Sequence, residues 1–440
     1  MEGLEFGFFM LGVLLLLIAL RLPIAIAMIA VGITGYVAVA GWTPLLNYFN
    51  SAAYWRFSTY DLSVVPLFLL MGQFATRAGM SKALFDAANV FLGHRKGGVA
   101  MAAIGGCAGF GAICGSSLAT AATMGQVALP ELRRFNYSGS LATGALAAGG
   151  TLGILIPPSV ILVIYAVLVE ANIATMFLAA FIPGFIAALG YIIVIMIYVR
   201  VSPESGPSGE RSTASERWAA IKEIWTVVLI FIVVIGGIYT GVFTPTEGAA
   251  FGAIGTGILA FFNGGMRKDG FIESVLGAGQ TTGMIFLIIF GADVLNVFLA
   301  LTQLPQELAA MISDAQMAPI LVLAVILFFY LIGGCVMDSL SMILLTIPIF
   351  WPILEEMDFG MNPEDVKVWF GIVALIVVET GLITPPVGMN VFVINSMSKD
   401  TPIAQTFKGV APFIASDVVR VGLLVTFPGI TLFLVNLFGN

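Results

Sequence analysis

Two pairs of consecutive prolines interrupt long apolar segments of the sequence. The first segment reads GILIPP from Gly153 to Pro158, and the second reads GLITPP from Gly381 to Pro386. Consecutive prolines remove two backbone donors and disfavour helical geometry in the residue before them, so carbonyl groups are left free where a helix breaks. Such carbonyls are suitable ligands for a hard cation such as Na+. The N–H groups that open the second half of each helix favour a carboxylate, so the two breaks predict a binding site.

Polar residues lie in the middle of the apolar segment that precedes each Pro-Pro pair. Ser116, Ser117 and Thr120 lie in the first segment, and Asp338 and Ser339 lie in the second. Each segment has about 35 residues, a length that suits two helices of half the membrane depth. Each segment therefore predicts a re-entrant hairpin with its polar tip near the middle of the membrane. Backbone at that depth must be buried in protein or line a polar cavity, because lipid supplies no hydrogen bonds.

Charges at the ends of the two hairpin segments indicate that they enter the membrane from opposite faces. The segment at about 97–132 is flanked by basic residues, at 94–96 and at 133–134. The segment at about 317–354 is flanked by Asp314 and by the acidic run at 355–358. Because basic loops stay on the cytoplasmic side, the first hairpin is expected to open to the cytoplasm and the second to the outside.

Simpler interpretations of these residues stay open. A proline can merely kink a helix, serines can serve helix packing alone, and Asp338 can cap the start of a half-helix. Glu379, which precedes the second break, can be functional or structural. Asp293 and the Asp417–Arg420 pair are interpreted as structural bridges within the helix bundle.

The composition is that of a membrane protein. Of the 440 residues, 59% are hydrophobic and 10% are charged, and the mean hydropathy is +1.05, whereas a soluble domain carries about 25% charged residues. The three cysteines and the single histidine have no zinc-site spacing, so neither a disulfide nor a structural metal is expected. The sequence contains no P-loop and none of the common hydrolase motifs, which argues against a nucleotide-driven pump and against an enzyme.

An internal repeat organises the chain. Landmarks recur in the same order 222 positions later: Pro23 as Pro245, Ser117 as Ser339, and Pro130 as Pro352. The repeat and the hairpin charges predict an all-α polytopic membrane protein of two inverted-topology repeats, each with a re-entrant helical hairpin and a Pro-Pro-broken helix. The repeats are placed at 1–201 and 224–440. The stretch 202–223 between them is expected to be a cytoplasmic linker, flexible over its Ser-, Gly- and Pro-rich part at 202–215.

The hydropathy pattern places the remaining helices. Broken helices are expected at about 138–170 and 367–398, a final helix at about 409–437, and single spans at about 4–20, 23–41, 62–78, 177–199, 224–242, 246–263 and 281–301. The N-terminus lacks the basic start of a cleaved signal peptide, so the first helix is expected to remain.

Four runs of residues carry a resemblance to a known family. They are GSSLAT at 115–120, LGILIPPS at 152–159, FTPTEGA at 243–249 and TPPVGMN at 384–390. They look like the large membrane subunit of tripartite ATP-independent periplasmic (TRAP) transporters, the DctM type, and the resemblance covers almost the whole chain. It implies Na+-driven import of an organic acid anion, such as a C4-dicarboxylate or sialic acid, by an elevator mechanism in the bacterial inner membrane. The distribution of basic loops separately predicts that both termini are periplasmic.

The resemblance also implies partners and site residues. The partners would be a periplasmic substrate-binding protein and a small membrane subunit of about four helices, which is expected to be a separate polypeptide because this chain begins with its first large-subunit helix. The helices at about 4–78 and 224–263 would form the scaffold, and the hairpins and broken helices would form the moving domain. The substrate would contact Ser116, Ser117, Thr120, Pro158, Asp338, Ser339, Thr384 and Asn390. Two or more Na+ ions would be held by Ser116, Ser117, Gly153, Pro157, Asp338, Ser339, Gly381, Thr384 and Gly388.

An alternative function is a stand-alone carrier of di- or tricarboxylates that needs no binding protein. The residues by themselves do not distinguish Na+ from H+ as the coupling ion, and they do not identify the anion. No organic cofactor and no nucleic-acid partner are expected.

Overall fold

Helices account for nearly all of the protein. The computed structural model describes residues 3–438, and within that range the chain forms helices and turns without any β-strand. The N-terminal part comprises α1 (Gly3–Ala19), α2 (Ile24–Ala40), α3 (Trp42–Phe57), the 3-10 turn η1 (Tyr60–Ser63), α4 (Val64–Arg77) and α5 (Met80–Leu92). The helices α3 and α5 were not expected from the hydropathy pattern, because neither is a long uninterrupted apolar run.

Two short, adjacent helices occupy the residues of the first expected hairpin. They are α6 (Gly98–Cys114) and α7 (Ser117–Arg134), and only Gly115 and Ser116 separate them. The chain continues through α8 (Gly139–Leu155) and α9 (Val160–Leu168), which are separated by the first Pro-Pro pair, to the long α10 (Ile173–Val201). The re-entrant placement of this hairpin in a membrane stays a prediction.

The same order of elements occurs in the C-terminal part. The helices α16 (Pro319–Gly334) and α17 (Ser339–Glu355) occupy the second hairpin segment, and α18 (Pro363–Gly381) and α19 (Met389–Met397) lie on either side of the second Pro-Pro pair. The last helices are α20 (Ile403–Thr426) and α21 (Gly429–Phe438). The expectation of a single final helix at 409–437 is wrong, because the chain breaks at Phe427 and Pro428, where proline has no N–H to continue the helix.

The middle of the chain differs from the sequence-based expectation at two places. It comprises the 3-10 turn η2 (Pro203–Ser205), α11 (Ala214–Phe231), the π-helical turn η3 (Ile232–Gly236), α12 (Gly237–Tyr239), α13 (Pro245–Phe262), α14 (Lys268–Leu301) and α15 (Leu304–Asp314). The helix α14 begins at Lys268 rather than near residue 281, and a further short helix, α15, follows it. The expected linker 202–223 is too long, since α11 begins at Ala214 behind a capping box of Thr213 and Glu216.

The linker that remains is fastened to the end of the first hairpin. The Ser205 carbonyl accepts a hydrogen bond of 3.0 Å from the Ser138 N–H, and the Gly206 carbonyl accepts one of 2.9 Å from the Gly97 N–H. The Gly209 N–H donates to the Gly93 carbonyl at 2.9 Å. A wholly flexible linker is therefore an incorrect expectation here, because backbone pairing with the loops beside α6 and α8 holds residues 205–209.

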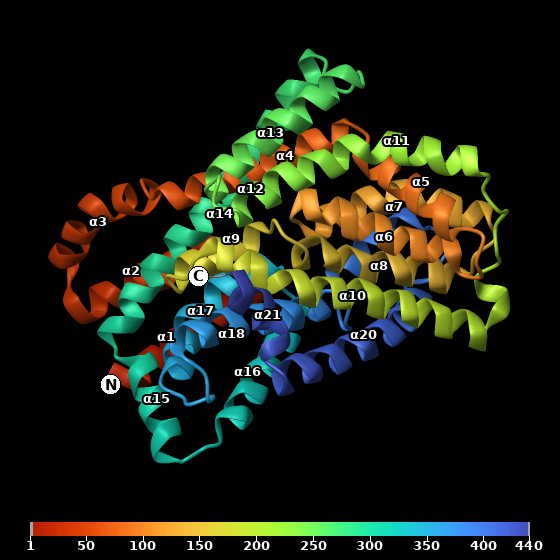
Figure 1. Ribbon diagram of the computed structural model, residues 1–440. Helices are drawn as coiled ribbons and strands as arrows, with labels where there is room; N and C mark the ends of the chain where they lie inside the picture. Colours follow the sequence, from red (N-terminus) through yellow and green to blue (C-terminus); the bar gives the residue numbers. More distant parts are fainter. Residues whose placement is uncertain (1–2, 439–440) are drawn as a thin grey trace.

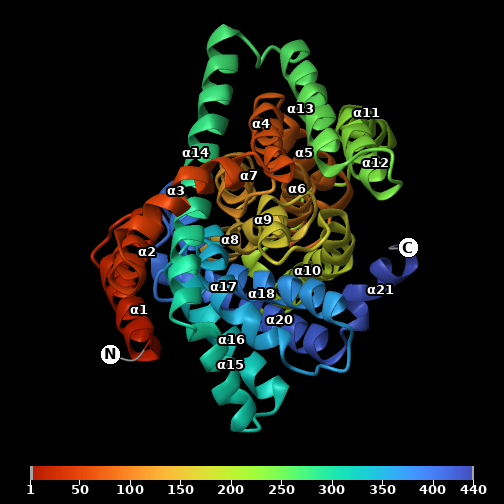
Figure 2. The ribbon, with the colours of Figure 1, turned by 90° about the vertical axis from the view of Figure 1, so that its left-hand side faces the viewer.

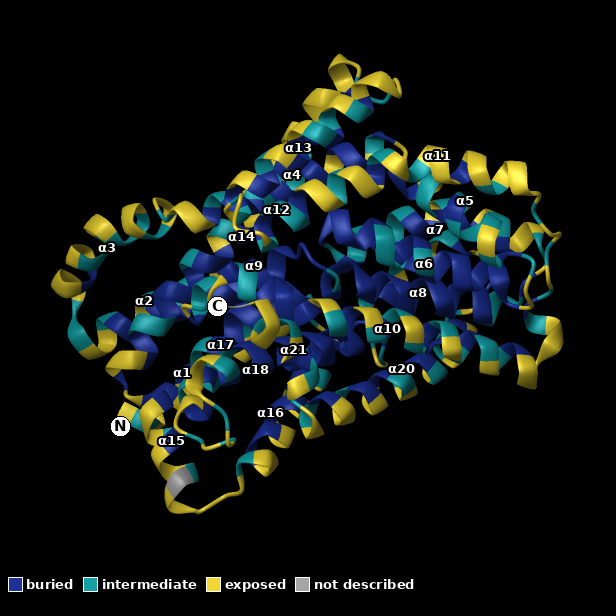
Figure 3. Ribbon diagram, in the orientation of Figure 1, coloured by how far each residue is buried: buried dark blue, intermediate teal, exposed yellow. Residues whose placement is uncertain are grey.

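The helices form a bundle with an apolar outer surface. In Figures 1 and 2 the connection between α13 and α14 projects beyond the rest of the bundle, while α6, α7 and α8 lie together inside it. Figure 3 shows that α6, α8 and α18 are mostly buried and that α3 and α11 carry many exposed residues. Within residues 3–438, four helices are long and apolar enough to cross a membrane, or up to six if each bent pair is one span. Exposed large apolar side chains such as Phe185, Phe262 and Phe328 suit a lipid-facing surface.

Candidate functional site

The tip of the first hairpin lies against the first Pro-Pro break. Gly115 has a positive φ of 62°, and a methyl group placed on it would lie 3.0 Å from the Pro158 carbonyl oxygen. The next residue, Ser116, caps α7, because its Oγ accepts a hydrogen bond of 3.4 Å from the Ala119 N–H. Pro157 and Pro158, joined by a cis peptide bond, are both buried.

Thr120 and Gly153 meet directly behind this tip. A methyl group on Gly153 would lie 2.4 Å from Thr120 Oγ1 and 2.8 Å from the Ser116 carbonyl oxygen, so only glycine permits α8 to approach α7 this closely. The Thr120 side chain is 0% exposed, and its Oγ1 has no hydrogen-bond partner among the described residues. A buried hydroxyl without a partner is costly. Two oxygens, Thr120 Oγ1 and the Ser116 carbonyl, thus converge on one small space.

The tip of the second hairpin lies against the second break in a similar way. A methyl group on Gly381 would lie 2.6 Å from the Gly334 carbonyl carbon, and the Gly388 N–H donates to the Cys335 carbonyl at 3.1 Å. Asp338 caps α17, where its carboxylate accepts hydrogen bonds from the Ser341 N–H at 3.0 Å and from the Ser341 Oγ at 2.6 Å. The capping interpretation of Asp338 is therefore confirmed.

The second break is arranged differently in detail. The Thr384 hydroxyl donates to the Thr380 carbonyl at 2.7 Å, and Pro385 and Pro386 are exposed. Asn390 is 0% exposed and points toward the first half, where its Nδ2 donates to the Ala147 carbonyl at 3.3 Å. Its Oδ1 has no partner among the described residues. Asn390 thus connects α19, in the second half of the chain, to α8 in the first half.

A single cavity of about 430 Å³ opens between the two tips. Four of the expected site residues line it: Ser116, Ser117, Asp338 and Ser339. In the described chain, the other expected substrate and ion ligands do not line this cavity: Thr120, Gly153, Pro157, Pro158, Gly381, Thr384, Gly388 and Asn390. The opposite wall comes from α4 and α14, through Leu69, Thr281, Met284 and Ile285.

Four helix N-termini point their first residues into this cavity. The first or second residues of α7, α9, α17 and α19 line it: Ser117 and Leu118, Val160 and Ile161, Ser339 and Leu340, and Met389. The first N–H groups of a helix have no partner within the helix, and the helix dipole adds a partial positive charge there. No Lys or Arg lines the cavity in residues 3–438, and its one charged lining residue is Asp338, which caps α17. The helix N-termini are therefore the groups of the cavity that can favour an anion.

Glu379, in the last turn of α18, contacts both hairpin tips. Its side chain is 0% exposed, and its two carboxylate oxygens accept hydrogen bonds from different hairpins, Oε2 from the Ser117 hydroxyl and Oε1 from the Ser339 hydroxyl. The sequence marks Glu379 as an intramembrane acid beside the second break, but nothing in its spacing predicts contact with the first hairpin, 262 positions away.

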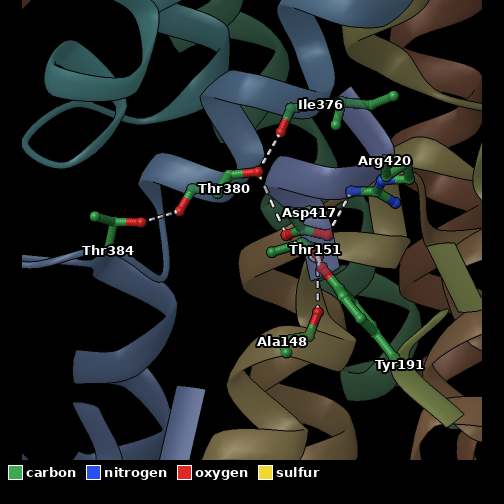
Figure 4. A network of polar contacts seen from close by, with 8 residues as sticks. All are labelled: Ala148, Thr151, Tyr191, Ile376, Thr380, Thr384, Asp417 and Arg420. Carbon is green, nitrogen blue, oxygen red and sulfur yellow. Dashed lines mark hydrogen bonds and ion pairs between the residues drawn. The ribbon is translucent and has the colours of Figure 1, made fainter. Parts of the chain in front are cut away.

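A second buried polar network lies next to Glu379. Asp417 on α20 accepts hydrogen bonds from Arg420 at 2.8 Å, from the Tyr191 hydroxyl at 2.8 Å and from the Thr380 hydroxyl at 3.3 Å (Figure 4). The expected bridge between Asp417 and Arg420 is confirmed. Asp293 is also in an ion pair, but its partner is Arg56 on α3, a residue far away in the sequence.

The apolar exterior, the buried polar tips and the cavity between two hairpins define a polytopic membrane transport protein. Comparison with known families makes the class specific. Residues 11–430 match the family described as the tripartite ATP-independent periplasmic transporter, DctM component. The chain belongs to this family, which confirms the resemblance found in the sequence motifs.

Individual relatives agree with that membership. The chain is 34% identical, over 93% of its length and 94% of the relative's, to the C4-dicarboxylate TRAP transporter large permease protein DctM of Pseudomonas aeruginosa. It is 31% identical to the sialic acid TRAP transporter large permease protein SiaM of Vibrio cholerae, with 86% of this chain and 87% of the relative aligned. The fold is similar to the crystal structure of the YdaH transporter of Alcanivorax borkumensis, with a TM-score of 0.61, 14% identity, and coverage of 88% of this chain and 90% of that one.

Proposed function

We propose that the protein imports an organic acid anion across the bacterial inner membrane, driven by Na+ and by an elevator movement of the hairpins. The observation that carries this proposal is the cavity of about 430 Å³ into which four helix N-termini point. The relatives' names give the class of cargo, since they include carriers of C4-dicarboxylates and of sialic acid.

The anion would lie in this cavity, between the hairpin tips. Its carboxylate would accept hydrogen bonds from N–H groups in the first turns of α7, α9, α17 and α19 that the helix caps do not engage. Caps or carbonyls already accept from the N–H groups of Ala119, Leu162, Ser341 and Asn390. Apolar residues such as Leu69 and Met284 would contact the carbon skeleton of the anion. Because every chain has backbone N–H groups, such a site has no signature residues in the sequence, such as a cluster of Lys and Arg. The class of cargo is therefore inferred from the relatives.

Two Na+ ions would be transported with the anion and would bind beside the tips. The first would be held among Ser116, Ser117, Thr120, Gly153 and Pro157, where Thr120 Oγ1 and the Ser116 carbonyl converge without a donor for the hydroxyl oxygen. The second would be held among Asp338, Ser339, Gly381, Thr384 and Gly388 at the other break. Hydroxyl and carbonyl oxygens are the ligands that a hard cation prefers.

An elevator movement fits the two kinds of cavity wall. The hairpins and broken helices supply the serines, Asp338 and the helix N-termini, whereas α4 and α14 supply three apolar side chains and Thr281. Because the polar groups lie on one side, that side can carry the bound anion past a mostly apolar wall without losing its ligands.

The proposal includes the partners that a tripartite transporter requires. A periplasmic binding protein would deliver the anion, a small membrane subunit of about four helices would support the scaffold, and both termini of this chain would be periplasmic.

Uptake into proteoliposomes tests the proposed function. The chain is reconstituted with and without its small subunit, and a labelled carboxylate is added with and without its binding protein. Uptake that needs an inward Na+ gradient and both partners, and that needs no ATP, is the expected result. Uptake that is unchanged without Na+ would refute the coupling, and Na+-driven uptake by this chain alone would favour the stand-alone carrier.

A further inference from the structure

Glu379 has a geometry that the proposed binding of anion and Na+ does not by itself require. A single buried carboxylate on α18 contacts the first residue of α7 and the first residue of α17. Ser117 and Ser339 are themselves 1% and 3% exposed, and both line the cavity. Positions 117 and 339 are equivalent in the repeat, and they are the one pair of equivalent hairpin positions at which both residues are serine. Glu379 contacts both of these serines.

The direction of these hydrogen bonds limits what the serines can bind. An ionised carboxylate only accepts hydrogen bonds, and a serine hydroxyl has one proton to donate and two lone pairs. The protons of Ser117 and Ser339 are therefore engaged with Glu379. Toward the cavity these hydroxyls can offer lone pairs and no donor, which suits a cation and repels a carboxylate.

We infer that Glu379 is a positioning residue that turns Ser117 and Ser339 into Na+ ligands and leaves the anion to the backbone N–H groups of the helix N-termini. This inference rests on the proposed function and divides its site into two kinds of ligand. Of the residues expected to bind both cargoes, Ser117 and Ser339 are assigned to the cation alone.

The buried charges near Glu379 support the same division. Asp417 and Glu379 are two carboxylates, and the guanidinium of Arg420 is bonded to Asp417, not to Glu379. Thr380, on the helix of Glu379, also donates to Asp417. No Lys or Arg in the described residues forms an ion pair with Glu379. A buried carboxylate without a counter-charge is costly, and a Na+ ion at the serine hydroxyls would supply that charge.

The alternative role for Glu379 is a purely structural connection between the two hairpins. Such a connection would affect folding, or the binding of both cargoes together, because it would hold the whole cavity in shape. A ligand-orienting role affects the cation selectively. The two roles therefore predict different changes in the Na+ and anion concentrations that give half-maximal uptake.

The experiment compares Glu379→Gln with Glu364→Gln in the complete transporter. Glu364 lies on the same helix, its side chain is 71% exposed, and it is paired only with Lys367 in the described structure. A Gln amide at 379 donates as well as accepts, so one serine hydroxyl is reversed. We expect Glu379→Gln to raise the Na+ concentration for half-maximal uptake at least tenfold. The anion concentration for half-maximal uptake, measured at saturating Na+, should change less than threefold. Glu364→Gln should leave both values unchanged.

A second pair of variants keeps the inference testable if Glu379→Gln does not fold. Ser339→Ala removes the oxygen and should raise the Na+ requirement at least tenfold, whereas Ser339→Thr keeps the hydroxyl and should stay within threefold of the wild type. Thermal stabilisation of the detergent-purified transporter by NaCl gives a readout of Na+ binding that is independent of uptake. Equal losses for Na+ and anion, or an unchanged Na+ requirement, would overturn the inference. A wild type without any Na+ dependence would instead refute the proposed function.

Discussion

Replacing Gly153 by alanine should damage the first Na+ site through one added methyl group. That methyl would lie 2.4 Å from Thr120 Oγ1 and 2.8 Å from the Ser116 carbonyl oxygen. An ordinary contact needs about 3.4 Å or more, so α7 and α8 must separate by roughly 1 Å at the point where the two oxygens converge. Overpacking of this kind costs about 1–3 kcal/mol.

The cost is expected to appear in Na+ binding, because the displaced atoms are the proposed ligands. If the whole strain opposes binding, 1–3 kcal/mol corresponds to about a 5- to 150-fold higher Na+ concentration for half-maximal uptake. The measurement is uptake in proteoliposomes as a function of Na+ concentration, at a fixed saturating anion concentration. Thermal unfolding of the same preparation separates loss of fold from loss of Na+ affinity.

A glycine on α6 supplies the matched control. A methyl group on Gly105 of α6 would have its nearest contact at 3.5 Å, with Ala88 Cβ, which is ordinary packing distance. Gly105→Ala should therefore leave Na+ dependence unchanged, and alanine is the better helix former. If Gly153→Ala folds and keeps the wild-type Na+ dependence, the two oxygens behind the first tip do not form a Na+ site.

Three further predictions concern stability and the linker. Asp338→Ala removes the cap of α17 and should lower the free energy of unfolding by about 0.5–2 kcal/mol, with Asp338→Ser recovering most of it in thermal unfolding. Arg420→Leu leaves the buried carboxylate of Asp417 without its partner and should cost about 3–5 kcal/mol, measured by denaturant unfolding in detergent; adding Asp417→Asn should recover part of that loss. Gly206→Val should detach the linker, since even a Cβ would lie 2.7 Å from Val199 Cγ1, and limited proteolysis between residues 206 and 213 should become faster.

Each of these has an outcome that contradicts it. Equal unfolding temperatures for Asp338→Ala and wild type would mean that the cap contributes nothing to stability. A double variant no more stable than Arg420→Leu alone would locate the cost in lost packing and not in the unpaired charge. Cleavage of Gly206→Val at the wild-type rate would show that the other linker hydrogen bonds suffice.

The breaks and the hairpin tips could be predicted from the sequence because they depend on local chemistry. Proline has no N–H wherever it stands, so the interruptions at 157–158 and 385–386 follow from the residues themselves. The capping function of Asp338 is local as well, since its partner Ser341 lies three residues further on. The family follows from the same motifs, because each of them is a short contiguous run.

The sequence marked Glu379 and Asp293 but could not identify their partners, because these contacts are long-range. Glu379 reaches Ser117 across 262 positions, and Asp293 reaches Arg56 across 237. Hydropathy also underestimated the length of α14, which begins at Lys268 with residues too polar for a membrane span. A helix can include such residues where it projects beyond the bundle, as α14 does in Figure 2. The linker looked flexible from its composition, but its backbone groups found partners in loops that only the fold brings near.

If the cavity binds an anion without Lys or Arg, as we propose, this has a consequence for a carrier that must also return empty. A guanidinium in the cavity would bind the anion strongly, but after release it would remain a fixed, unpaired charge within the membrane, which is costly. Helix N-termini supply donors and a partial positive charge while each helix stays neutral as a whole. The carboxylates of Asp338, which lines the cavity, and of Glu379, which contacts the lining serines, are then the fixed charges at the site, and the proposed Na+ ions offset them when the site is loaded. On this reasoning the cation affects more than the driving force: it completes the electrostatic environment in which the helix N-termini can hold a carboxylate.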